Sequence, residues 1–111
     1  MLLTRFAPLA LLGACVMQTP PSQAEPVAGI GYSDLALDTS AGRAALRQRV
    51  ADAVRGYCAR HGDQVTPVSL RYDPYYCPDM MRSTLMAKMP RGVRWAYSLA
   101  RREAGVRGRR L

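Results

Sequence analysis

The sequence has a single histidine and none of the patterns that usually carry catalysis. It contains no G-x-S-x-G nucleophile elbow, no glycine-rich phosphate loop and no paired catalytic histidines. His61 directly precedes Gly62 after an amphipathic stretch, which is typical of a residue at the end of a helix. Nucleophilic catalysis needs a nucleophile beside a base that a third group orients. We therefore expect no enzyme activity, no catalytic residue, no cofactor and no small-molecule substrate.

The apolar segment near the start of the chain is too short to cross a membrane. Residues 6–17 are uncharged and number twelve, whereas a membrane-spanning helix needs about 20 residues. They follow Arg5 and precede a polar segment that contains two prolines and ends in Ser22-Gln23-Ala24. This succession of charged, apolar and small-residue regions is typical of a secretory signal peptide. We therefore predict that residues 1–24 are removed on export and that the mature chain is periplasmic or secreted.

A second processing site lies within the same leader. Leu12-Gly13-Ala14-Cys15 resembles the Leu-x-small-Cys pattern at which bacterial lipoproteins are cleaved and acylated. Acylation at Cys15 would anchor the protein, because each buried CH₂ contributes about 0.8 kcal/mol of membrane affinity. Alternatively, Cys15 is a small apolar residue of a leader that is discarded. The sequence leaves open both a free chain and a membrane-anchored lipoprotein.

Cysteine is scarce, with three residues in the chain. Because Cys15 falls in the leader, Cys58 and Cys77 remain as one pair, and an exported protein meets an oxidising compartment. We predict that they form a disulfide, which closes a loop of about 20 residues and contributes roughly 3 kcal/mol in the loop-entropy description. Two free buried thiols are the alternative, and they would fit a cytosolic chain.

The most regular pattern in the chain is an amphipathic helix. Thr39 or Ser40 can accept hydrogen bonds from its first free N–H groups, and His61-Gly62 resembles its end. Gly42 in the first turn costs about 1 kcal/mol relative to alanine, which indicates that other backbone approaches closely there. The apolar stripe, at helical spacing, consists of Leu46, Val50, Ala53, Val54, Tyr57 and Cys58.

Weaker patterns flank this helix. Residues 32–37 and 68–72 alternate enough to form short strands. Cys77-Pro78-Asp79 favours the start of a second helix, because proline and aspartate both suit a first helical turn. Residues 93–100 support a last helix that ends near Gly105. The expected fold is mainly α, a small disulfide-stapled helical hairpin with a short N-terminal extended arm and at most a minimal two-stranded pairing (α+β).

Positive charge is concentrated at the end of the chain. Residues 25–79 have six Arg against seven acidic residues, a net charge of −1, whereas residues 80–111 have eight Arg and Lys88 against Glu103, a net charge of +8. This asymmetry favours an anionic partner such as an envelope surface, a lipid or a polysaccharide, and an exported protein is not expected to meet nucleic acid. The candidate binding residues are Arg91, Arg94, Trp95, Arg101, Arg102, Arg107, Arg109 and Arg110. The alternatives are a solvated tail and a Trp95 that packs with Tyr97 on the helices.

Soft metal ligands form a third pattern. Cys58 and His61 have C-x-x-H spacing, and Cys77 can lie nearby in space. However, a disulfide takes both thiolates, and methionines at helical spacing usually fill a core. Periplasmic metal handling is therefore kept as an alternative function, and no metal ligand is assigned. The thioethers that would suit Cu(I) are those of Met80, Met81, Met86 and Met89.

A longer pattern runs from the extended arm through the first helix to the second cysteine. It consists, in order, of Tyr32, Asp34, Leu35, Leu37, Gly42, Arg43, Leu46, Arg49, Val50, Ala53, Cys58 and Cys77. These residues, spread over 30–80, resemble the UrcA family of small exported bacterial proteins. The chain departs from the family at Ala36, where an acidic residue is common, and after Cys77, where it is longer and more basic. The resemblance implies a signal peptide, a cysteine pair and periplasmic residence, and it brings no activity.

These patterns divide the chain into three parts. Residues 1–24 are the signal peptide, residues 25–105 form an UrcA-like domain, and residues 106–111 form a basic tail that is too polar and glycine-rich to pack and is expected to be disordered. The expected function is non-catalytic, that of an accessory or stress-associated binding protein of the Gram-negative envelope. A lipid-anchored or anionic-surface-binding module is the first alternative.

Overall fold

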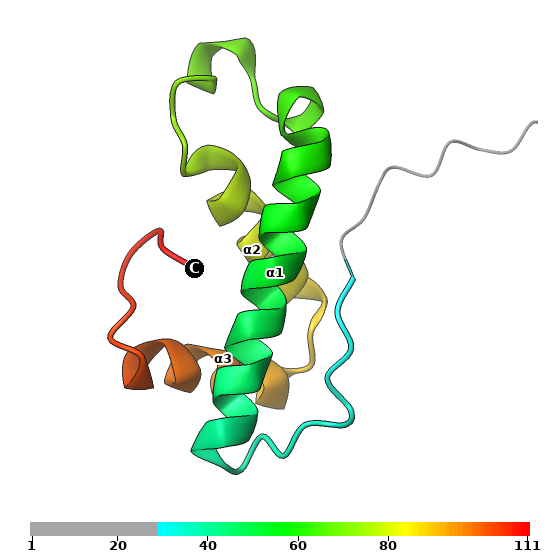
Figure 1. The fold of residues 1–111 in the computed structure, drawn as a ribbon, viewed down its shortest axis with the longest axis vertical. Coiled ribbons are helices and arrows are strands. Elements are labelled where there is room, and N and C mark those ends of the chain that lie inside the picture. Colours follow the sequence, from blue (N-terminus) through cyan, green and yellow to red (C-terminus); the bar gives the residue numbers. More distant parts are fainter. Residues whose placement is uncertain (1–28) are drawn as a thin grey trace, which may run out of the picture.

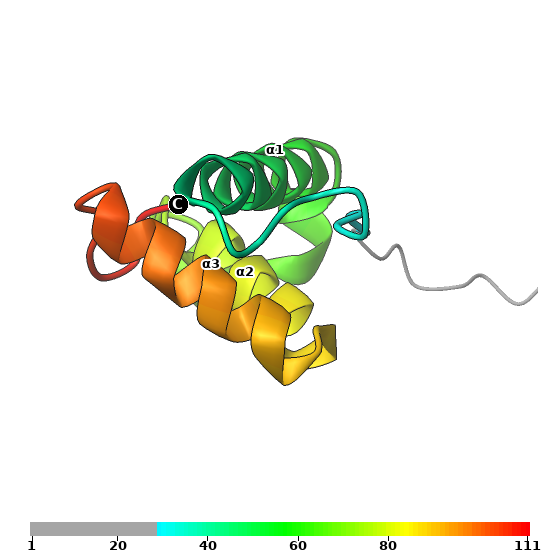
Figure 2. The ribbon, with the colours of Figure 1, turned by 90° about the horizontal axis from the view of Figure 1, so that it is seen from below.

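The computed structural model describes residues 29–111, which contain three α-helices, one short 3-10 helix and no strand. Figures 1 and 2 show α1 on one side of the molecule and α2 with α3 on the other, and α1 packs against both. The prediction of a mainly helical, disulfide-stapled fold is confirmed. The elements are α1 (Ser40–Val65), η1 (Val68–Leu70), α2 (Tyr76–Lys88) and α3 (Arg91–Glu103). The predicted signal peptide and Cys15 lie outside the described residues.

The ends of α1 follow from its capping residues. Thr39 Oγ1 accepts a hydrogen bond from the Gly42 N–H at 3.0 Å, as expected for an N-cap. The prediction of an end at His61-Gly62 is wrong, since the helix continues to Val65 and the Thr66 N–H donates to the Gly62 carbonyl at 3.0 Å. Gly62 does not have the positive φ of a glycine that ends a helix.

The two predicted strands are also absent from the described part of the chain. In the first segment the Leu35 N–H donates to the Tyr32 carbonyl at 3.0 Å, which closes a turn. The second segment forms η1 and continues into turns, with Tyr72 98% exposed. A strand needs a partner along its hydrogen-bonding edge, and both segments instead bond within their own turns. The alternation of side chains in the sequence was therefore not a sign of a sheet.

The core lies between α1 and the other two helices. The disulfide between Cys58 and Cys77 joins the C-terminal half of α1 to the first turn of α2, with 5.9 Å between the Cα atoms. This confirms the predicted pair, and the predicted apolar stripe of α1 does face the core. The buried cluster consists of Leu46, Val50, Val54, Tyr57, Cys77, Met81, Leu85, Val93, Ala96 and Tyr97.

The N-terminal arm is held against α1 by arginines. Both terminal nitrogens of Arg49 donate to the Asp34 carboxylate at 2.7 Å, and its Nη1 also donates to the Gly31 carbonyl at 3.0 Å. Arg43 Nη1 donates to the Leu37 carbonyl at 3.3 Å. Leu37 and the other apolar residues of the arm pack on the core cluster. A segment without a strand or helix is thus fixed by side chains of the neighbouring helix.

Gly42 is the point of closest approach between the arm and α1. A Cβ atom at this position would overlap the carbonyl group of Ala36. That carbonyl accepts hydrogen bonds from the Thr39 N–H at 3.1 Å and the Thr39 hydroxyl at 2.8 Å. The close backbone approach expected from a glycine in a first helical turn is therefore confirmed.

Candidate anionic-surface interface

Helix α3 has two faces of different chemistry. Its inner face is buried against α1, and Tyr97 on that face is 4% exposed. On its outer face, residues spaced three or four apart put arginines and a tryptophan side by side in solvent. Trp95 is 60% exposed. Of the two aromatic residues that the alternative placed on the helices, only Tyr97 is therefore packed there. We call this surface the outer face of α3, and it consists of Arg91, Arg94, Trp95, Ser98 and Arg102.

The arginines of the outer face have no acidic partner within residues 29–111. Each ion pair in this part of the chain involves Arg43, Arg49, Arg82 or Arg109 instead. Arg91 and Arg94 also lie in the first turn of α3, which contains no acidic residue. Positive charge at a helix N-terminus costs about 0.3–1 kcal/mol at an exposed site. The stability of the helix therefore gives no reason for these two charges.

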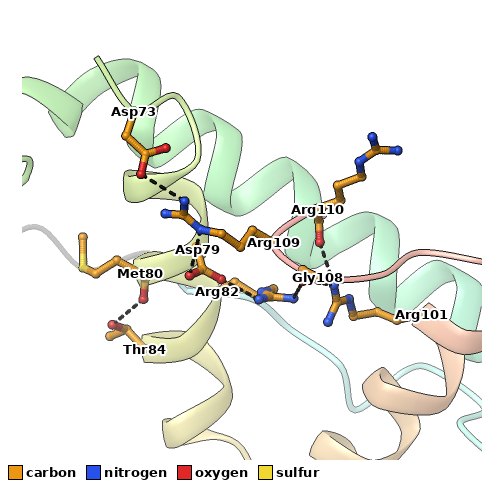
Figure 3. Close-up of polar contacts among 9 residues, drawn as sticks. All are labelled: Asp73, Asp79, Met80, Arg82, Thr84, Arg101, Gly108, Arg109 and Arg110. Carbon is orange, nitrogen blue, oxygen red and sulfur yellow. Dashed lines mark hydrogen bonds and ion pairs between the residues drawn. The ribbon is translucent and has the colours of Figure 1, made fainter. Parts of the chain in front are cut away.

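The C-terminal tail is packed rather than free, which corrects the expectation for residues 106–111. Arg109 Nη1 donates to Asp73 Oδ2 at 3.0 Å, its Nε lies 3.5 Å from Asp79 Oδ2, and its guanidinium lies over the Tyr75 ring. Leu111 packs against the core cluster. Figure 3 shows Arg109 reaching the two carboxylates from the tail. The composition of the tail indicated disorder because burial of its few apolar atoms would not by itself offset the conformational entropy lost on ordering.

Two glycines turn the tail back toward α2. Gly105 has a φ of 69° and Gly108 a φ of 65°, conformations that favour glycine. The Val106 N–H donates to the Arg101 carbonyl at 2.9 Å and the Gly105 N–H to the Arg102 carbonyl at 3.1 Å, the two bonds of a Schellman motif. This ends α3 near Gly105, as the sequence predicted.

Two of the predicted anion-binding residues face the protein itself. Arg101 Nη2 donates to the carbonyl oxygens of Gly108 at 2.7 Å and Arg110 at 2.9 Å. Arg109 is engaged by Asp73, and the backbone N–H of Tyr75 together with Arg109 lowers the pKa of that carboxyl. Arg107 and Arg110 have exposed side chains without an ion pair in the described part of the chain. The structure thus separates an outward set of arginines from two that hold the tail.

Sequence reasoning missed Arg82, which lies beside this tail. Its Nη2 donates to Asp79 at 2.6 Å, and its Nη1 lies 3.4 Å from the Gly108 carbonyl oxygen. The spacing of Asp79 and Arg82 by three residues on a helix was a usable signal for the ion pair. Its contact with the tail depends on a chain reversal that no local pattern specifies.

The residues considered for metal binding are bonded to each other or packed within the fold. Cys58 and Cys77 are bonded to each other, and the His61 ring lies 5.0 Å from that of Tyr57. Met81 is buried, and the other three methionines pack against the core cluster. Within residues 29–111, no three His, Cys, Asp or Glu side chains come together as a metal site. No observation on these residues favours metal handling over a role in packing.

Helices long and apolar enough to cross a membrane do not occur among the described residues.

Comparisons of the chain with family models, curated proteins and solved structures find no match. The resemblance to the UrcA family therefore stays a prediction that rests on the residues given above.

Proposed function

We propose that this chain is a small exported protein of the bacterial envelope, without catalytic activity, that binds an anionic surface through the outer face of α3. One observation carries this proposal. Arg91, Arg94 and Arg102 lie on one exposed face beside Trp95 and have no acidic partner within residues 29–111. Because no acidic side chain within residues 29–111 pairs with these arginines, their positive charge can attract a negatively charged partner.

The composition of the outer face fits an extended surface better than a small ligand. Its arginines follow one line along the helix instead of converging on a point, and Trp95 projects among them. A tryptophan has an apolar ring with a polar N–H, a combination that suits the headgroup boundary of a membrane. We therefore take anionic lipid as the first partner to test. Lipid anchoring at Cys15 would add to this attraction.

Export is supported by the cysteines. A disulfide that links two helices persists in an oxidising compartment and is rare in a cytosolic chain. The leader-like residues 1–24 and the resemblance to exported proteins favour the same location. An envelope protein is close to anionic lipids and polysaccharides, so location and surface charge agree.

The test is binding of the oxidised protein to vesicles that contain an anionic lipid, followed by tryptophan fluorescence. Trp95 is the chain's one tryptophan, so the signal reports on the outer face. We expect a blue shift with anionic vesicles and none with zwitterionic vesicles. The triple variant Arg91→Gln, Arg94→Gln, Arg102→Gln should bind on the order of 100-fold more weakly, since each arginine at such a surface contributes about 1 kcal/mol.

A matched control removes the same charge from another part of the surface. Arg55, Arg60 and Arg71 are exposed and have no ion pair within residues 29–111. Their replacement by glutamine should weaken binding by much less than the α3 variant. Equal weakening by both triple variants would show that only net charge matters and would reject the outer face as the binding surface.

A further inference from the structure

A small open groove lies between α2 and α3, beside the C-terminal tail. Its volume is about 190 Å³, and its lining residues are Arg82, Ser83, Met86, Tyr97, Ser98 and Arg101. Pockets for drug-sized ligands are typically about 300–1,000 Å³. This groove therefore has the size for a compact chemical group, and its lining combines two guanidiniums with three hydroxyls.

Both guanidiniums point at the same backbone oxygen. Arg101 Nη2 lies 2.7 Å and Arg82 Nη1 3.4 Å from the Gly108 carbonyl oxygen, as Figure 3 shows. Arg101 Nη2 also donates to the Arg110 carbonyl at 2.9 Å. Two positive charges thus share one neutral acceptor, the Gly108 carbonyl, and a negatively charged acceptor would be bound more strongly than this carbonyl.

The positive charge of this pair is only partly compensated. Asp79 accepts from Arg82 at 2.6 Å, but the same carboxylate also lies 3.5 Å from Arg109. Arg101 has no acidic partner in the part of the chain that the structure describes, and its buried Nε has no hydrogen-bond partner there. Burial and the neighbouring charge of Arg82 lower the pKa of Arg101. A buried N–H without an acceptor costs free energy, which is recovered if the Arg101 side chain turns its Nε toward a bound anion.

We propose that this groove binds a phosphate group, with Arg82 and Arg101 as its charged ligands and the hydroxyls of Ser83 and Ser98 as further donors. Arginine matches phosphate because its planar fork can donate two parallel hydrogen bonds. The phosphate oxygens replace the Gly108 and Arg110 carbonyls, so binding is coupled to release of the tail. This site shares Ser98 with the outer face of α3 but has different charged ligands, since Arg91, Arg94 and Arg102 are not among its lining residues.

The ligand can be free phosphate or the phosphomonoester headgroup of a lipid, because both present the same terminal oxygens. Inorganic phosphate is titrated into the full oxidised chain at constant ionic strength, with chloride as the balancing anion, and binding is measured by calorimetry. The Arg Nε–H signals are followed by NMR. We expect saturable binding of one phosphate per chain and a shift of the Arg101 Nε–H signal. No binding beyond the chloride control would overturn the proposal.

Arg101→Gln and Arg102→Gln form a matched pair, because they remove the same charge from adjacent residues of α3. We expect Arg101→Gln to weaken phosphate binding at least tenfold and Arg102→Gln to change it less than twofold. Equal weakening would overturn the proposal in favour of diffuse charge attraction. If Arg101→Gln does not fold, Ser98→Asp serves instead, since a carboxylate in the groove should abolish binding, and retained affinity would overturn the proposal.

Vesicles that contain phosphatidate distinguish the two sources of phosphate. Displacement of inorganic phosphate by these vesicles, lost in Arg101→Gln, supports a lipid headgroup as the ligand. Phosphate binding without displacement by vesicles supports a free anion. Neither result depends on the proposed function, whose failure is recognised separately by equal effects of the two triple variants on vesicle binding.

Discussion

Replacing Gly42 with alanine should destabilise this protein, although the same change inside a helix is normally stabilising. Alanine is favoured over glycine by about 1 kcal/mol in a helix interior. At Gly42, however, the new methyl group would overlap the Ala36 carbonyl, which already accepts two hydrogen bonds from Thr39. Displacing that carbonyl moves the arm, with the Leu37 contacts to the core and to Arg43.

Overpacking of this kind typically costs about 1–3 kcal/mol. A loss of 1 kcal/mol corresponds to a decrease of about 4–8 °C in the melting temperature of a domain of this size. We therefore expect Gly42→Ala to melt at a lower temperature than the parent chain, as followed by far-UV circular dichroism of the oxidised protein.

Gly62 provides the control, because it lies in the same helix and a Cβ added there would meet no atom within 4 Å among residues 29–111, apart from its chain neighbours and the nearby backbone of α1 itself. Gly62→Ala should raise the free energy of unfolding by about 0.5–1 kcal/mol. Opposite signs for the two substitutions would support the reasoning. If Gly42→Ala also stabilises the protein, then the arm does not lie against α1 as described.

Three further predictions test other contacts. Reduction of the disulfide between Cys58 and Cys77 should lower the free energy of unfolding by about 3 kcal/mol; a urea midpoint that does not change with reductant would contradict this. Hydrogen bonding to Arg49 lowers the pKa of Asp34 from 3.8 to about 2, below its value in the unfolded chain. The stabilisation is thus present above about pH 4 and lost as the pH falls through 2; Asp34→Asn should flatten this part of the stability profile, and an unchanged profile would argue against the pair. Arg109→Gln should speed amide hydrogen exchange in residues 106–111, whereas Arg107→Gln should not; equal rates in both variants would mean that Asp73 does not hold the tail.

The residues of the pattern that begins at Tyr32 and ends at Cys77 have a clear structural use in this chain. Asp34 pairs with Arg49, the Leu37 carbonyl accepts from Arg43, and Gly42 lets the Ala36 carbonyl approach. These residues of the pattern therefore hold the arm, which forms no strand, against α1. Ala36 has an exposed side chain and contributes its backbone oxygen to the contact with Thr39.

The candidate interface was only partly predictable from the sequence. The excess of arginine after residue 80 was evident, and so was the helix that carries half of these arginines. The division of roles was not, because Arg101 and Arg102 are adjacent in sequence but differ by about 100° around the helix. One lies beside α2 and the tail, and the other faces solvent.

The sequence by itself determined the helices, the cysteine pair and the uneven charge, because helical spacing, capping residues and composition are local properties. Tertiary structure alone decided that the arm and the connector form turns and that Arg109 draws the tail onto Asp73. Each of these outcomes depends on a partner far along the chain or on the absence of one. A local pattern cannot supply that information, since it records what a segment can form and not what the rest of the fold leaves for it to contact.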